Sequence, residues 1–86
     1  MWLEVDAQNF HGALREAEKK LESVQGELVL DFSSVLRIDA GSLKAMEEFT
    51  ALAADKSIKV VLRGVNVGVY KVLKLVKLAS RFSFVN

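Results

Sequence analysis

The candidate catalytic side chains in this sequence are His11, Asp31 and Asp39. Nucleophilic hydrolysis needs a base beside its Ser or Cys. The chain has no Cys, and its one His lies beside Gly12 in a segment without a catalytic signature. We therefore interpret His11 as a surface residue. The carboxylates of Asp31 and Asp39 could form an acid–base pair or hold Mg²⁺.

Asp31 also follows an apolar run, as the phosphoacceptor aspartate of a receiver domain does. A receiver has an acidic pair after its first strand, whereas Asp6 stands alone here. We therefore favour capping and loop-fixing roles for the two carboxylates, with an aspartate switch or a small enzyme as the alternative. Gly64 and Gly68 form no phosphate-binding motif, and metal-ligand spacing is absent. The prediction is a non-enzymatic protein without metal or cofactor.

Both carboxylates belong to the stretch ELVLDFSSVLRIDAGSL, residues 27–43, around which the chain is organised. Its first apolar run is too short for a helix and typical of a buried strand, which we place at 28–32. Ser33 and Ser34 then supply turn chemistry, because their hydroxyls can bond nearby backbone groups. A second apolar step leads to Asp39.

Asp39 is placed as the N-cap of the next helix, where its carboxylate can accept a hydrogen bond from the N–H of Gly41 or Ser42. Helical spacing continues from there to about residue 54. The pattern predicts a helix N-terminus that faces solvent, with small residues in its first turn. An anion or the acceptor groups of a partner can dock at such a terminus.

Apolar spacing predicts four strands alternating with three helices in the order β-α-β-α-β-α-β. The strands fall near 2–6, 28–32, 58–62 and 82–85, and the helices near 10–24, 40–54 and 66–79. Alternation of this kind implies right-handed crossovers and a largely parallel sheet, the α/β class. The length allows one domain, residues 1–86. The β-branched third strand predicts burial on both faces.

Charge is distributed unevenly although the net charge is only +1. Eleven acids and five bases precede residue 56, whereas seven bases and no acid follow from Lys56 onward. If the two halves occupy different faces, the basic side favours acidic partners. Aromatic residues do not interleave the bases, so nucleic-acid binding is not predicted.

Lys71, Lys74 and Lys77 recur at every third position, opposite Val and Leu residues. Such a stripe could lie on an anionic membrane, but a helix that packs on a sheet must bury its apolar side, and we favour that interpretation. No apolar run is long enough to span a bilayer, and the N-terminus has no signal-peptide pattern. We expect a cytoplasmic protein without membrane insertion.

The segment LDFSSVLRIDAGSL resembles the signature of the STAS domain family, found in anti-sigma factor antagonists and sulfate-transporter tails. The family form has a hydrophobic strand ending in LDLS, an apolar link ending in Ile-Asp, and Ser-Ser-Gly-Leu opening a helix. The order of elements from about Val5 to Val85 is similar to that family as well. The family usually carries an additional N-terminal hairpin strand, which this sequence does not supply before its first strand.

The resemblance assigns roles position by position. Asp39 and Leu43 match the family's Asp and Leu, while Ala40 and Gly41 stand in place of the two serines. The family's phosphoacceptor is the second serine, so that position is Gly41, which has no hydroxyl. Ser42 lies one residue later, and we favour local hydrogen bonding over phosphorylation for it.

We expect a protein–protein interaction module that binds through the Asp39 loop and the exposed side of the following helix. The predicted contact residues are Asp39, Ala40, Gly41, Ser42, Lys44 and Glu47. By resemblance, the leading interpretation is an anti-sigma factor antagonist that regulates transcription by binding a kinase-like anti-sigma factor. The alternative is a subunit of a lipid-transport ABC complex, or of a stress-signalling assembly, that binds its partner constitutively. Homodimerisation stays open.

Overall fold

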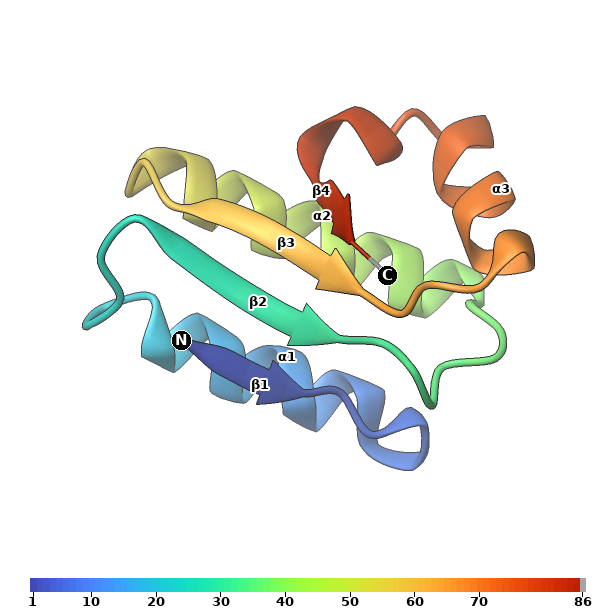
Figure 1. Ribbon diagram of the computed structural model, residues 1–86, viewed down its shortest axis with the longest axis horizontal. Helices are drawn as coiled ribbons and strands as arrows, with labels where there is room; N and C mark the ends of the chain where they lie inside the picture. The colour runs from blue at the N-terminus through green and yellow to red at the C-terminus, as the bar shows by residue number, and fades with distance from the viewer. Residues whose placement is uncertain (86) are drawn as a thin grey trace.

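Four short strands form the centre of the computed structural model, which describes residues 1–85 (Figure 1). The strands are β1 (Trp2–Glu4), β2 (Glu27–Asp31), β3 (Lys59–Arg63) and β4 (Ser83–Val85). The α-helices are α1 (Phe10–Lys20), α2 (Ala40–Asp55) and α3 (Val67–Leu75), with 3₁₀ turns η1 (Ala7–Asn9) and η2 (Ala79–Arg81).

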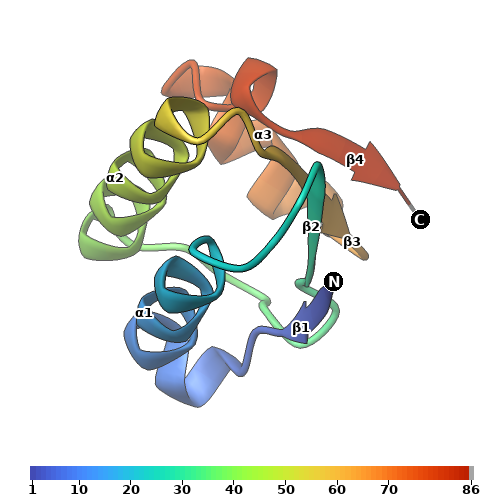
Figure 2. The same cartoon turned by 90° about the vertical axis from the view of Figure 1, so that its left-hand side faces the viewer.

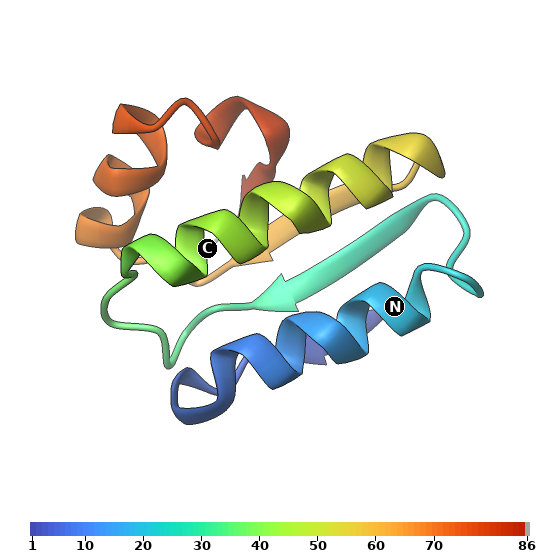
Figure 3. The same ribbon diagram turned by 180° about the vertical axis from the view of Figure 1, so that it is seen from behind.

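The sheet order is β1-β2-β3-β4, and every neighbouring pair is parallel. Successive right-handed crossovers in one direction bring the helices to one side of the sheet. Figures 2 and 3 show α1 and α2 side by side on that face, with α3 toward the carboxyl ends of the strands. The predicted α/β fold and its order of elements are confirmed. Strand β1 forms one edge of the sheet among the described residues.

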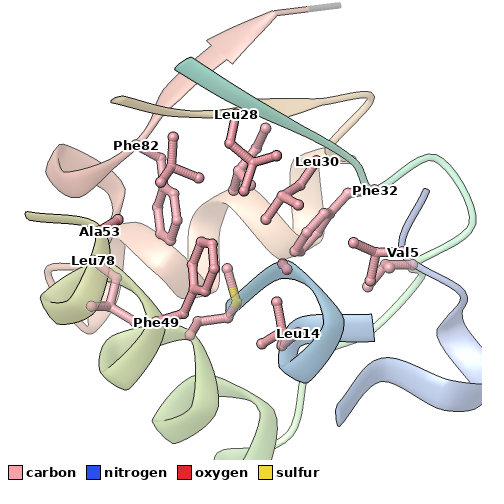
Figure 4. Packing of buried hydrophobic residues seen from close by; sticks show 14 of the residues in the cluster. Val5, Leu14, Leu28, Leu30, Phe32, Phe49, Ala53, Leu78 and Phe82 are labelled. Atoms are coloured by element: carbon pink, nitrogen blue, oxygen red, sulfur yellow. The ribbon is translucent and has the colours of Figure 1, made fainter. Parts of the chain in front are cut away.

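The core lies between the sheet and helices α1 and α2 (Figure 4). Alternate residues of β2 and β3 point into it because successive strand side chains face opposite sides of a sheet. Phe32 and Phe49 are its largest fully buried side chains. Helix α3 contributes less, with the following residues buried in or just after it: Val69, Leu73 and Leu78.

The opposite face of the sheet carries no helix within residues 1–85. Trp2, Val29 and Val61 stand in register across it, and the Arg63 guanidinium lies 4.9 Å from the Trp2 ring centroid. Val61 is only 5 % exposed. The prediction that the third strand is buried on both faces is thus confirmed for Val60, Val61 and Leu62, although no helix among residues 1–85 lies on the outer face.

Two helices end earlier than predicted. Helix α1 stops at Lys20 instead of 24, and α3 stops at Leu75 instead of 79. After α3, Lys77 adopts a left-handed φ of 65°, and the N–H of Leu78 donates to Leu73 O at 2.8 Å. This is a Schellman motif, which ends the helix and returns Leu78 to the core. The valine and lysine spacing continues past this point, so periodicity alone could not locate the turn.

Candidate functional site

The candidate site is the N-terminal tip of α2 with the loop that leads into it. Asp39 is the N-cap, with extended backbone, and its Oδ1 accepts a 2.7 Å hydrogen bond from Ser42 N. The predicted cap is therefore confirmed. Helix capping of this kind satisfies one of the orphan N–H groups of the first turn. Ala40 and Gly41, which follow, are exposed.

The remaining predicted contact residues do not all face solvent. Lys44 and Glu47 are exposed on the first two turns of α2, as the expected contact requires. Ser42 is only 8 % exposed. Its backbone N–H is bonded to Asp39. A kinase would reach the Ser42 hydroxyl only if the first turn of α2 opened, because the residue is buried.

The electrostatics of the tip centre on Asp39. The backbone N–H of Ser42, first, and then its side chain hold the pKa of the Asp39 carboxyl below its ordinary value of 3.8, and an electrostatic contribution from the nearby His11 side chain acts in the same direction. His11 lies beside the tip: a Cβ on Gly41 would stand 3.9 Å from its ring. Sequence reasoning treated His11 as an unrelated surface residue, because α1 and α2 are far apart in the chain.

The loop between β2 and α2 is anchored at several points. Asp31 Oδ1 accepts from Ser33 N at 2.9 Å, and Ser34 Oγ donates to Val5 O at 3.0 Å. Phe32 and Val35 are buried in the core. This anchoring leaves the next residue, Leu36, pointing outward and 74 % exposed.

Asn66 ties this loop to α3. Its Oδ1 caps α3 by accepting from Val69 N at 2.7 Å, while Nδ2 donates to Val35 O at 3.4 Å and Leu36 O at 3.2 Å. A hollow of about 300 Å³ lies between the two segments, lined by Leu36, Arg37, Ile38, Gly68, Val69 and Val72. The N-termini of α2 and α3 therefore lie at the same end of the molecule, toward the carboxyl ends of the strands (Figure 1).

The proposed acid–base use of Asp31 finds no support in this geometry. The hydroxyl and the backbone N–H of Ser33 both donate hydrogen bonds to the Asp31 carboxylate. The hydroxyl bond, first, and then the N–H bond lower the pKa of Asp31, while burial acts in the opposite direction. Arg63 Nη1 adds a weaker attraction at 3.9 Å. Within residues 1–85, no three His, Cys, Asp or Glu side chains gather into a metal site. These contacts give Asp31 a structural role, in which it holds the start of the β2–α2 loop.

Sequence reasoning missed three residues of this site: His11, Leu36 and Asn66. An apolar Leu36 next to a predicted cap offered a weak signal, since a loop residue without a core partner has no reason to be large and apolar. Asn66 gave only the signal of a helix N-cap. Its bonds to residues 35 and 36 depend on the tertiary structure. The tip combines exposed apolar, small and charged groups, which suits recognition of another protein.

The four-stranded parallel sheet with a capped helix tip after β2 is the arrangement that the resemblance to the STAS family implied. The STAS domain family model matches residues 3–86, and the chain belongs to this family. Two similar proteins are the intermembrane phospholipid transport system binding proteins MlaB of Escherichia coli K12 and of Shigella flexneri. Each is 38 % identical over 63 residues, which span 73 % of this chain and 65 % of the relative.

None of the helices among the described residues is both long enough and apolar enough to cross a membrane.

Proposed function

We propose that this chain is the STAS-type binding subunit of a phospholipid-transport complex and that it holds a transporter ATPase through the α2 tip. The tip surface consists of Leu36, Asp39, Ala40, Gly41, Lys44 and Glu47, with Ser42 beneath it. The similarity to two phospholipid-transport binding proteins supports lipid transport over anti-sigma antagonism. With an ATPase as its partner, the proposed location of the subunit is the cytoplasm, where ATP is supplied.

Leu36 carries the argument for a protein partner. It is 74 % exposed, and the hydrogen bond from Asn66 Nδ2 to its carbonyl holds it in place beside the tip. A large apolar side chain that is exposed on an anchored backbone gains free energy by entering a partner's pocket, and the loop itself loses little conformational entropy. The exposed charges of Lys44 and Glu47 would then form the polar rim of the contact.

Binding through this surface is proposed to be constitutive. The position where the family carries its phosphoserine is Gly41, and Ser42, whose backbone N–H caps onto Asp39, is buried. A phosphate would add roughly −1.5 to −2 charge at the tip, and without an accessible hydroxyl no such switch operates. Incubation with ATP and a cognate Ser kinase should therefore leave Ser42 unmodified by intact-mass analysis. Stoichiometric phosphorylation at Ser42 would contradict constitutive binding.

Gly41 allows a sharp test of the surface. A Cβ there would meet Asp39 Oδ1 at 3.6 Å and His11 at 3.9 Å, which are ordinary contact distances. Gly41→Glu should therefore fold at least as well as the wild type, because replacing Gly within a helix removes an entropic cost of about 1 kcal/mol. The bulk and charge of Glu should nevertheless weaken capture of the ATPase at least tenfold.

Gly41→Ala is the matched control and should bind almost as the wild type does. Leu36→Ser should also weaken capture, whereas Leu75→Ser, on α3, should not. Affinity can be measured by titrating the purified ATPase subunit against each variant. Full binding by Gly41→Glu would rule out the tip surface. Capture of a kinase-fold anti-sigma factor in place of the ATPase would favour the antagonist function.

A further inference from the structure

Helix α3 presents a second surface that the proposed partner contact does not use. Its inward side carries the buried residues Val69 and Leu73. Lys71, Lys74 and Leu75 lie together on the outward side, because positions i, i+3 and i+4 share one face of a helix. Leu75 is 81 % exposed, the highest value among the large apolar residues of the described chain.

The turn after α3 extends this surface. Val76 is 46 % exposed, and Lys77 follows it in the left-handed turn. A hollow of about 500 Å³ adjoins it, lined by Tyr70, Lys74, Lys77, Ala79, Ser80 and Phe84. Two ammonium groups and two hydroxyl-bearing side chains thus border one depression. The α3 basic surface is defined here as Lys71, Lys74, Leu75, Val76 and Lys77.

No acidic side chain offsets these charges. The sequence has no Asp or Glu after Asp55, and none of the three lysines forms an ion pair with a carboxylate among residues 1–85. Helix α3 lies beyond the carboxyl ends of the strands, so neither α1 nor α2 covers its outward side (Figures 1 and 3). The surface is therefore both cationic and apolar, and it is open.

We propose that the α3 basic surface docks peripherally on an anionic lipid bilayer. A bilayer supplies hydrocarbon for Leu75 and Val76 and phosphates for the lysines, whose long stems let the ammonium groups remain at headgroup level. Nucleic acid would satisfy the charges but offers Leu75 no apolar contact. A fluid bilayer, unlike a protein, needs no pocket of matched shape for Leu75 and Val76, and a comparison with polyglutamate tests an acidic protein as the alternative occupant.

This inference does not rest on the proposed partner contact, because the two surfaces use different residues. The expected affinity is modest and depends on charge. Each lysine near an anionic surface strengthens binding about fivefold, so neutralising Lys71 and Lys74 together should weaken it about 25-fold. Leu75→Ser, which removes the apolar side chain that enters the bilayer, should weaken binding about tenfold.

Sedimentation of the purified protein with vesicles tests the proposal. Binding is expected to vesicles of equal parts phosphatidylcholine and phosphatidylglycerol, but not to phosphatidylcholine alone. Binding should fall steeply as salt is raised toward about 1 M, where the Debye length shrinks to about 3 Å. The Lys71→Gln/Lys74→Gln and Leu75→Ser variants should lose binding as stated, with unchanged circular dichroism because all three side chains are exposed.

Leu36→Ser is the matched control for Leu75→Ser, since both remove a highly exposed Leu, and it should bind vesicles as the wild type does. Gly41→Glu should likewise keep vesicle binding while losing the ATPase, which separates a failure of one proposal from a failure of the other. Absence of binding to anionic vesicles, or equal binding by all variants, would overturn the inference. Binding to polyglutamate or DNA that is as tight as to vesicles and indifferent to Leu75→Ser would also overturn it.

Discussion

Replacing Asn66 by Ala should destabilise the protein more than an ordinary partly exposed substitution does. The side chain makes three hydrogen bonds: it accepts from Val69 N at 2.7 Å and donates to Val35 O and Leu36 O at 3.4 and 3.2 Å. Loss of the N-cap costs about 1 kcal/mol. The two longer bonds are worth about 0.5 kcal/mol each, since they lie at the long end of the usual range.

The sum is a loss of about 2 kcal/mol in the free energy of unfolding. For a domain of this size, that lowers the melting temperature by about 8–16 °C. In urea, with a slope of about 1 kcal/mol per M, the midpoint should fall by about 2 M. Circular dichroism follows the helices, and fluorescence of Trp2, the one tryptophan, reports independently on the sheet. Coincident transitions would justify the two-state treatment.

Asn66→Ser separates the two roles. It keeps a side-chain oxygen that can cap α3, since Ser is about as good an N-cap as Asn. It loses both donors to the loop that carries Leu36. We expect Asn66→Ser to cost about half as much as Asn66→Ala but to weaken partner capture, because Leu36 is no longer held. A loss below about 0.5 kcal/mol for Asn66→Ala, or equal losses for both variants, would refute this account.

Two further predictions concern the β2–α2 loop. Gly64 has a φ of 73°, and a Cβ added there would collide with Ser33, whereas a Cβ added at Gly26, where φ is 84°, would meet no atom within 4 Å. Gly64→Ala should therefore lower the free energy of unfolding more than Gly26→Ala does. Equal urea midpoints for the two variants would show that the collision relaxes freely. The folded-state pKa of Asp31 lies below 3.8, so its contribution to stability is present above that pH and is lost as the pH falls through the folded value. Asp31→Asn should therefore flatten the acid limb of the stability curve, and an unchanged limb would contradict the charge effect.

Local patterns were sufficient to predict the elements and the tip. Leu28 and Leu30 alternate with Val29 in a short apolar run, and the strand forms where that pattern lies. The Asp39 cap is made with Ser42, three positions away, so a local stretch of sequence is enough to predict it. The order of helices and strands could be predicted because the apolar residues of each element recur with the period typical of a helix or of a strand.

The ends of α1 and α3 and the neighbours of the tip could not be predicted in the same way. Helix α3 ends at Leu75 because Leu78 must turn back to bond Leu73 and enter the core, and the lysine spacing contains no sign of that turn. Nothing near His11 in the chain indicates that it lies beside Gly41. The exposure of Val76 was also unexpected, because the helical spacing placed it on the apolar side opposite the lysines, which a sheet-packed helix buries.

The amino-acid sequence by itself determined the α/β class, the largely parallel sheet and the capped tip, because these depend on periodicity and on contacts within one turn; the family was indicated by the resemblance of residues 30–43 to the STAS signature. The tertiary structure alone decided which side chains surround the tip and which are left exposed. Asn66 reaches residues 35 and 36 from about thirty positions away, and Ser42 is buried beneath the surface that it was predicted to form. Burial and long-range hydrogen bonds arise when separate elements pack, so no local pattern encodes them.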